Sequence, residues 1–345
     1  MNKSKIDWCD YTWNPITGCY HDCTYCYARK LANRFAGDTR QNMADKRCKH
    51  IGSGLYELNE PFTARNGRTL ATPFGFYPTL HKYRMNHLEQ RPTGANIFVG
   101  AMADVFGEWV PDEWIKDIFE ACKNNPQHNY LFLTKNPERY RVLVQQGLLP
   151  KGENMWYGFS FTNTQADILV KCEEYHSFIS IEPILEDIGD YIQGFPTIAD
   201  WIIIGAETGN RKGKVIPKVE WIEKIVAHCD KFNIPVFMKE SLRSIVGDEN
   251  MRQEYPTQLL HKEISEKNKK RLLALCSRCG KEMKKSDMYS VLAKKKRKES
   301  AILIGNVCTD CWPSFLEDLN YDNKTDIGTS ESNGDKCSCR KKESQ

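Results

Sequence analysis

Apolar and polar positions alternate along the first two thirds of the chain in a way that separates short strands from longer helices. Runs that are apolar throughout, and rich in β-branched or aromatic residues, predict eight strands at residues 12–17, 73–77, 97–101, 130–134, 156–161, 178–181, 201–205 and 235–238. Amphipathic stretches predict helices between several of these strands, at residues 111–123, 137–146, 164–175 and 218–232. Strands without a polar face are typical of a parallel sheet that is buried on both sides.

This alternation predicts an α/β fold, as a complete or partial (β/α) barrel of the TIM type. In such a barrel, the loops at the carboxyl ends of the strands carry the function. A doubly wound open sheet is the alternative, although no Gly-x-Gly-x-x-Gly sequence follows the first strand to suggest a dinucleotide site. We expect the barrel to occupy residues 1–245, with a polar and irregular insertion at residues 37–70.

The composition changes after residue 245. Residues 246–275 suggest a linker that runs into a charged helix, residues 276–320 a small basic module, and residues 321–345 a disordered tail. The 345 residues carry a net charge of +4, but thirteen basic and two acidic residues between Lys267 and Lys298 give that segment +11 and leave −7 for the rest. No stretch approaches the ~18 consecutive apolar residues of a membrane helix, and no apolar leader is present, which predicts a cytoplasmic protein.

Fourteen cysteines in a cytoplasmic protein indicate metal ligation before disulfide bonds. Cys19, Cys23 and Cys26 follow the first predicted strand with the spacing C-x3-C-x2-C. Three thiolates at this spacing suit three irons of a [4Fe–4S] cluster and leave the fourth iron without a protein ligand. A zinc site completed by water or by His21 is the alternative. Cys9 is either a spare ligand or a small buried residue.

This spacing, with Tyr25 directly before the third cysteine, resembles the radical S-adenosylmethionine superfamily. The resemblance implies that the open iron binds S-adenosylmethionine and that reduction yields a 5′-deoxyadenosyl radical, which abstracts hydrogen from a substrate. It also implies an electron donor of the flavodoxin or ferredoxin kind. Over residues 7–245, segments such as WNPITGC, AMADVFGEWVPDEW, GFSFTN and PVFMKES are similar to a phage- and bacterium-encoded radical family whose substrates are unassigned.

A polar residue follows each of the last six predicted strands, and in a barrel these residues would surround one mouth beside the cysteine loop. They are Asp104, Lys135, Asn163, Glu182, Glu207 and Lys239. Acids and an amide suit the hydroxyl and ammonium groups of S-adenosylmethionine, so the candidate cofactor-binding residues are Tyr25, Asp104, Asn163, Glu182 and Glu207. Lysines suit a carboxylate or phosphate, and the candidate catalytic residues are Lys135, Lys239 and Glu207. For any one of them, the alternative is a salt-bridged loop residue or a helix cap.

A second cysteine group lies in the basic module. Its two Cys-x2-Cys pairs, separated by 28 residues, are Cys276 and Cys279, then Cys308 and Cys311. Such pairs are typical of structural zinc, and an auxiliary iron–sulfur cluster is the alternative. A basic run between the pairs suits the phosphate backbone of a nucleic acid, with protein docking or solubility as alternatives. This run is Lys294, Lys295, Lys296, Arg297 and Lys298. No partner is identified for Cys337 or Cys339.

The leading hypothesis is a radical S-adenosylmethionine enzyme with an N-terminal barrel and a C-terminal zinc module. The expected substrate is a nucleobase, a nucleotide or a nucleic acid, and this expectation depends only on the basic module. Two alternatives remain: a radical enzyme that acts on a peptide or small metabolite, and a non-enzymatic zinc protein that binds nucleic acid.

Overall fold

The computed structural model describes residues 1–164, 174–193 and 199–260, and in the last part of the chain five strands with residues 310, 311 and 313. The chain divides into two units, Met1–Leu259 and Leu260–Gln345. The first unit continues past residue 245, where the sequence placed its end, because Tyr255 and Leu259 pack into its core. The helix expected at residues 164–175 lies almost entirely outside the described residues.

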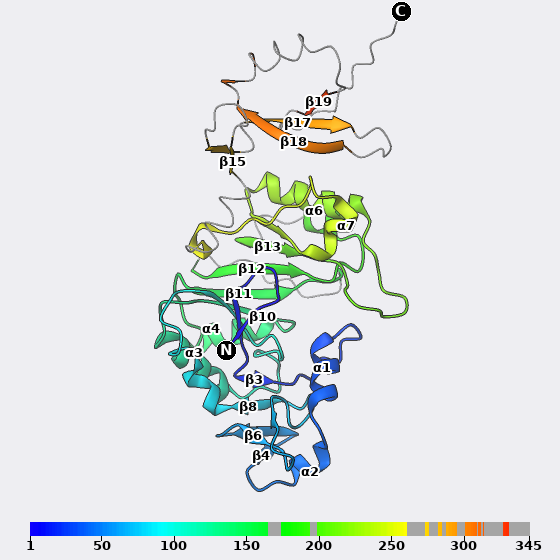
Figure 1. Cartoon of the computed structure of the whole chain (residues 1–345). Helices are drawn as coiled ribbons and strands as arrows, with labels where there is room; N and C mark the ends of the chain where they lie inside the picture. The colour runs from blue at the N-terminus through cyan, green and yellow to red at the C-terminus, as the bar shows by residue number, and fades with distance from the viewer. Residues whose placement is uncertain are drawn as a thin grey trace, which may run out of the picture. The chain divides into compact units, whose positions relative to one another are not determined.

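An eight-stranded sheet forms the centre of the first unit (Figure 1). In spatial order its strands are β1 (Asn2–Lys3), β2 (Tyr11–Trp13), β9 (Asn96–Val99), β10 (Asn129–Thr134), β11 (Met155–Ser160), β12 (His176–Ile181), β13 (Trp201–Ile204) and β14 (Val236–Met238). All neighbours are parallel except β1 and β2. From β9 onward the spatial order follows the sequence order, whereas a doubly wound sheet reverses direction. Among the described strands β14 pairs only with β13 and β1 only with β2, so no complete barrel is closed.

The α-helices that follow β9, β10, β12 and β13 cover one face of the sheet of this α/β unit. They are α3 (Asp112–Lys123), α4 (Glu138–Gln145), α5 (Gly189–Gln193) and α6 (Val219–Lys231). Ile97 of β9 packs in one core with Ile118 of α3, and Ile202 of β13 packs in another with Ile225 of α6. No helix among the described residues is long and apolar enough to cross a membrane.

Neighbouring side chains of a strand point to opposite faces, so a second set of apolar side chains lies on the other face of the sheet. Phe98, Phe178 and Trp201 form a third core with Trp8 from the N-terminal segment and Leu259 from the end of the unit. Three short elements follow β14 and lead to Leu259, namely η2 (Glu240–Leu242), α7 (Arg243–Val246) and η3 (Thr257–Leu259).

The first two predicted strands differ from the structure. The strand predicted at residues 12–17 is divided into β2 and β3 (Ile16–Thr17), with Pro15, which has no N–H to donate, between them. The strand predicted at residues 73–77 is wrong. Gly75 has a φ of +65° and its N–H donates to the carbonyl of Thr72, so this segment turns, and β8 (Thr79–His81) follows it.

The insertion that the sequence left irregular is folded. Its strands β4 (Lys49–Gly52) and β5 (Leu55–Leu58) join β8 and β3 in a four-stranded sheet, and β6 (Phe62–Thr63) pairs with β7 (Thr69–Leu70) in a hairpin. With helices α1 (Tyr27–Phe35) and α2 (Thr39–Met43) and the short helix η1 (Lys82–His87), this part of the chain extends over residues 27–87, which are called the insertion from here on (Figure 1). Strands of two to four residues are too short to show a period of two in the sequence, which explains the missed prediction.

The second unit contains β15 (Leu273–Leu275) paired with β16 (Glu282–Lys284), and β17 (Met288–Lys294) between β18 (Ala301–Cys308) and β19 (Ile327–Ser330). The β17–β18 hairpin follows the first Cys-x2-Cys pair and ends at Cys308, the first cysteine of the second pair. Strand β19 falls within the tail that the sequence suggests to be disordered. Several predicted site residues lie outside the described part of the chain, namely Cys276, Cys279, Lys295, Lys296, Arg297, Lys298, Cys337 and Cys339.

Candidate functional site

The cysteine loop connects β3 to α1 and begins at a glycine that no other residue can replace without movement. Gly18 has a φ of +91°, and a Cβ there would lie 2.3 Å from the carbonyl oxygen of Tyr77. Its N–H donates to the carbonyl of Met102 at 2.9 Å, and the N–H of Cys19 donates to that of Phe76 at 3.1 Å. The start of the loop is therefore fixed between the insertion and the turn that follows the carboxyl end of β9.

The end of the loop is fixed by helix α1. The N–H of Cys26 donates to the carbonyl of Cys23 at 3.1 Å, and the Sγ of Cys26 caps the helix by accepting from the N–H of Arg29 at 3.3 Å. Cys19, Cys23 and Cys26 are all half-buried. Burial raises the pKa of the Cys19 thiol to about 12, and it also raises the pKa of Cys23. Such thiols lose their proton when a metal binds them.

The donors of this loop are thiols, which bind both iron–sulfur clusters and zinc. Cys9, the spare ligand considered above, is buried and its thiol donates to Ser4 Oγ at 3.2 Å. A cubane cluster takes one thiolate for each iron. The three thiols therefore fit a [4Fe–4S] cluster that has one iron without a protein ligand.

Asp104, five residues after the end of β9, connects several segments around the loop. Its side chain is 7% exposed, and its Oδ2 accepts from His21 Nε2 at 2.7 Å and from the N–H of Lys135 at 2.8 Å. Its Oδ1 accepts from the N–H of Phe106 at 2.9 Å. The ring of His21 also meets Trp109 edge-on at 4.9 Å. Asp104 therefore connects the cysteine loop with the ends of β9 and β10.

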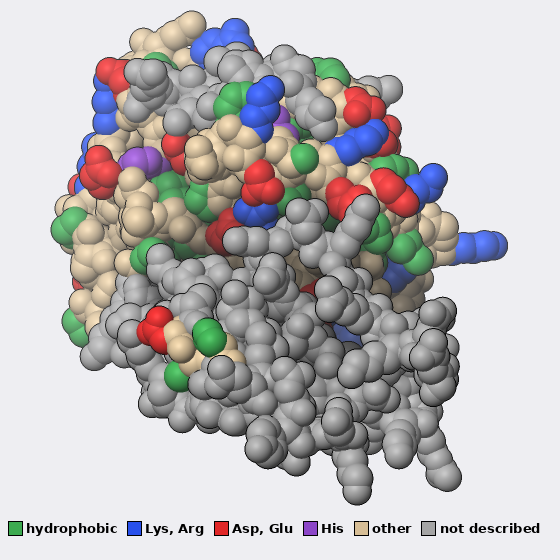
Figure 2. Space-filling model, turned by 90° about the horizontal axis from the view of Figure 1, so that it is seen from above, with side chains coloured by type: hydrophobic (Ala, Val, Ile, Leu, Met, Phe, Trp, Pro, Cys, Tyr) green, Lys and Arg blue, Asp and Glu red, His purple; other side chains and the backbone are tan. Residues whose placement is uncertain are grey.

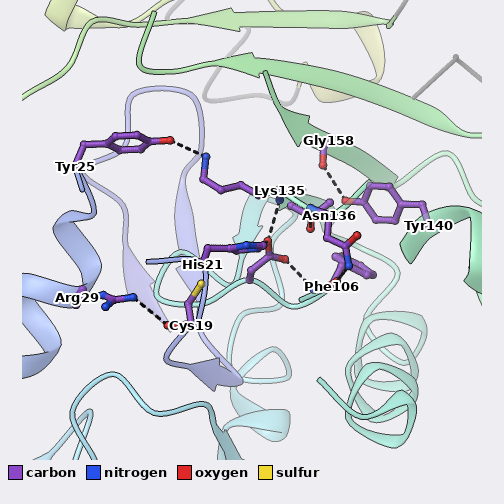
Figure 3. A network of polar contacts seen from close by, with 11 residues as sticks. Cys19, His21, Tyr25, Arg29, Phe106, Lys135, Asn136, Tyr140 and Gly158 are labelled. Carbon is purple, nitrogen blue, oxygen red and sulfur yellow. Dashed lines mark hydrogen bonds and ion pairs between the residues drawn. The ribbon is translucent and has the colours of Figure 1, made fainter. Parts of the chain in front are cut away.

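Lys135 extends from the end of β10 toward the residue that precedes the third cysteine. Its Nζ donates to Tyr25 Oη at 2.9 Å (Figure 3). The Lys135 charge also lies close enough to Cys23 to oppose the rise in the pKa of that thiol. An ammonium beside a thiol stabilises the thiolate form, which is the form that binds metal.

A second charged pair lies on the ends of β12 and β14. Lys239 Nζ donates to Glu182 Oε1, and this pair crosses over Gly205 of the intervening β13 end. A Cβ on Gly205 would lie 3.1 Å from Lys239 Cδ and 3.2 Å from Glu182 Cγ, so glycine gives the pair its space. Tyr27 lies nearby. Burial of its hydroxyl end, followed by the Glu182 charge, raises its pKa, although half of the residue is exposed.

The two remaining candidates, Glu207 and Asn163, lie beyond the ends of β13 and β11. Glu207, after β13, accepts from Arg211 Nε at 2.6 Å and from its second nitrogen at 2.7 Å. The hydrogen bonds from Arg211 lower the pKa of Glu207. Asn163 follows β11 and is half-buried. The structure thus brings Tyr25, Asp104 and Lys135 to the cysteine loop, and it ties Glu207 to its own loop.

Residues 3–254 match the model of a protein family described as "Protein of unknown function (DUF5131)". The chain belongs to this family. The match covers nearly the whole first unit, including the cysteine loop and all six strand-end residues. None of the curated proteins matches the sequence.

The DUF5131 chain is also similar to solved structures of spore photoproduct lyase. One is complexed with dinucleoside spore photoproduct (11% identity, TM-score 0.40) and one is a double mutant with bound AdoMet and the same dinucleoside (10% identity, TM-score 0.39). Each alignment covers 69% of this chain and 78% of the other. These scores are too low to bear on the chemistry of this chain.

Sequence reasoning missed two residues of this DUF5131 site. The sequence suggests His21 only as a zinc ligand, whereas its Nε2 forms a hydrogen bond with Asp104 Oδ2. Tyr27 was not singled out, yet its hydroxyl donates to the carbonyl of Ala101 at 3.0 Å beyond β9. Neither interaction has a local signal, because 83 and 74 residues separate the partners.

Proposed function

We propose that this chain is a radical S-adenosylmethionine enzyme. The observation that carries the proposal is the loop of Cys19, Cys23 and Cys26, which is fixed at Gly18 and at the first turn of α1 and lies next to the turn beyond β9. The three thiolates would bind three irons of a [4Fe–4S] cluster and leave the fourth for S-adenosylmethionine. When bound and reduced by a flavodoxin- or ferredoxin-like donor, these groups supply a 5′-deoxyadenosyl radical for hydrogen abstraction.

The chain's own residues would position and neutralise these groups. Lys135 would offset the negative charge of a ligated Cys23 while holding Tyr25 in place. Glu182 and Lys239 offer a carboxylate and an ammonium side by side, which suits the hydroxyl or ammonium groups of a cofactor and an anionic group of a substrate. Asp104 and Glu207, whose oxygens are engaged within the chain, act as positioning residues, and Asn163 completes the cofactor side.

The test is anaerobic reconstitution of the full chain with iron and sulfide. We expect about four irons per chain, and a reduced paramagnetic signal that shifts when S-adenosylmethionine is added. Replacing Cys19, Cys23 and Cys26 together with alanine should abolish both. The matched control is Cys48→Ala, since Cys48 is also half-buried but lies outside the loop, in the insertion. It should retain full iron.

Two outcomes would overturn the proposal. One is a chain that holds zinc and no cluster, which would favour the non-enzymatic nucleic-acid-binding alternative. The other is iron that remains bound in the triple variant, because the ligands would then lie elsewhere.

The four C-terminal cysteines are proposed to hold one zinc ion in a separate site, as their two Cys-x2-Cys pairs suggest. Replacing Cys308 and Cys311 with serine should remove one zinc per chain, measured by elemental analysis, and leave the iron unchanged. Loss of iron instead would assign an auxiliary cluster to these cysteines. The expected substrate class remains a nucleobase, a nucleotide or a nucleic acid.

A further inference from the structure

A surface pocket of about 480 Å³ lies at the carboxyl-terminal end of α1, within the insertion. Its lining includes the last two residues of the helix, Arg34 and Phe35, together with Arg65 and Arg68 from the loop of the β6–β7 hairpin. Arg47 adds a fourth guanidinium. The volume is within the range of pockets that bind small ligands. No step of the proposed chemistry uses this pocket.

Positive charge in this pocket is largely available to a ligand. Arg34, Arg65 and Arg68 are exposed and form no ion pair within the described part of the chain, whereas Arg47 is paired with Asp45 at 2.7 Å. The carboxylate of Asp38, the other acid in the lining, accepts from two backbone N–H groups of α2. Four arginines against Asp38 and Asp45 leave the lining with a net positive charge, which attracts an anion.

This charge is local. Residues 27–70 hold nine basic and four acidic residues, a net charge of +5, whereas residues 1–259 as a whole have a net charge of −2. On the face shown in Figure 2, acidic and basic side chains are interspersed instead. Helix α1 itself contains Arg29, Lys30 and Arg34 and no acid.

An exposed apolar surface with two aromatic rings lies on the same helix as these basic residues. Tyr27, Leu31 and Phe35 are 52%, 42% and 43% exposed, and their spacing of four residues places them along one side of α1. The guanidinium groups of Arg34 and Arg68 lie 5.3 and 5.8 Å from the centre of the Phe35 ring. Proteins bind single-stranded nucleic acids with surfaces of this kind, because the bases stack on aromatic rings and the cations bind the phosphates.

We propose that this surface binds a single-stranded nucleic acid. It extends from Tyr27 to the pocket lined by Arg34, Arg47, Arg65 and Arg68, which is called the arginine pocket. Arg34, Arg65 and Arg68 hold its phosphates, and a base stacks on Phe35. An acidic protein would satisfy the charges but would leave the exposed aromatic stripe without a role. The nine residues of α1 extend about 13 Å from the cysteine loop to the pocket, so a strand on this surface runs toward that loop. Binding stands on its own, whereas the strand's role as substrate rests on the proposed function.

The test measures binding of the full chain, without reconstituted cluster, to fluorescent 15-nucleotide dT and U strands by anisotropy. Arg65→Glu with Arg68→Glu should weaken binding by about tenfold or more and lower the slope of log affinity against log salt by about 0.7 for each phosphate that the variant no longer binds. The matched control is Lys116→Glu with Lys123→Glu on α3, which makes the same change in charge at exposed positions. It should cause less than a threefold change.

Phe35→Ala separates stacking from charge. It should weaken binding of the single strand by about tenfold and leave binding of a duplex of the same length unchanged, because duplex bases are already stacked. Two results would overturn the proposal. One is an equal loss of affinity in the Arg65→Glu, Arg68→Glu variant and in the α3 control variant, and the other is an unchanged affinity in Phe35→Ala. Because no cofactor is needed in this assay, such a failure would leave the iron–sulfur proposal standing, and a failed reconstitution would leave this one standing.

Discussion

Asp104→Asn tests whether this carboxylate organises the site. An amide keeps one acceptor oxygen and replaces the other with a donor. If the nitrogen takes the place of Oδ1, the N–H of Phe106 loses its acceptor, and if it takes the place of Oδ2, the N–H of Lys135 does. Either orientation leaves a backbone donor unsatisfied, which costs about 1–3 kcal/mol. For a unit of this size the melting temperature should fall by about 3–10 °C.

Tryptophan fluorescence during heating is a suitable assay, because seven of the eight tryptophans lie within residues 1–259. The control is Asp190→Asn, which also removes a carboxylate from an ion pair, here with Lys224, but at a side chain that is 78% exposed. Exposed pairs contribute about 0–1 kcal/mol. If Asp104→Asn melts within 1 °C of the wild type, as the control should, the reasoning about Asp104 is refuted.

Three further outcomes are expected. Gly18→Ala should fold but bind less iron on reconstitution, because its Cβ would meet the Tyr77 carbonyl at 2.3 Å and displace the cysteine loop; full iron content would contradict this. Gly158→Ala should destabilise the first unit by about 1–3 kcal/mol in urea unfolding, since its Cβ would lie 2.3 Å from the buried Phe178 ring, and an unchanged midpoint would count against it. Glu207→Gln should be less stable than the wild type at pH 7. Hydrogen bonds from Arg211 lower the pKa of Glu207 below its usual 4.5, so the stability difference between wild type and variant should have its full size above pH 4.5. It should shrink as the pH falls through the lowered pKa. A stability difference that grows in acid would contradict this reasoning.

The large sheet could be predicted from the sequence because its signal is local. Six predicted strands, from residues 97–101 to residues 235–238, match β9 to β14 within about two residues, since each is a continuous apolar run followed by a polar residue. The polar positions at the strand ends were found for the same reason. The hydrogen-bond partners of these residues could not be predicted, because whether Lys239 meets Glu182 or another acid depends on which strands become neighbours. Only the Glu207 and Arg211 pair, four residues apart, lay within the reach of local reasoning.

The arginine pocket shows a different limit of sequence reasoning. Charge counted along the chain points to the segment from Lys267 to Lys298, where thirteen basic residues are concentrated, and leaves the rest as an acidic body. Arg34 and Arg68 are 34 positions apart in that body, and only the pairing of β6 with β7 and the path of α1 bring both guanidinium groups to one phenylalanine ring. Along the chain, four acids separate these basic residues, so residues 27–70 have a net charge of +5 against +11 for the shorter segment from Lys267 to Lys298. The position of a nucleic-acid site in this chain therefore has to be argued from the folded surface, where the helix that begins at Cys26 ends among unpaired arginines.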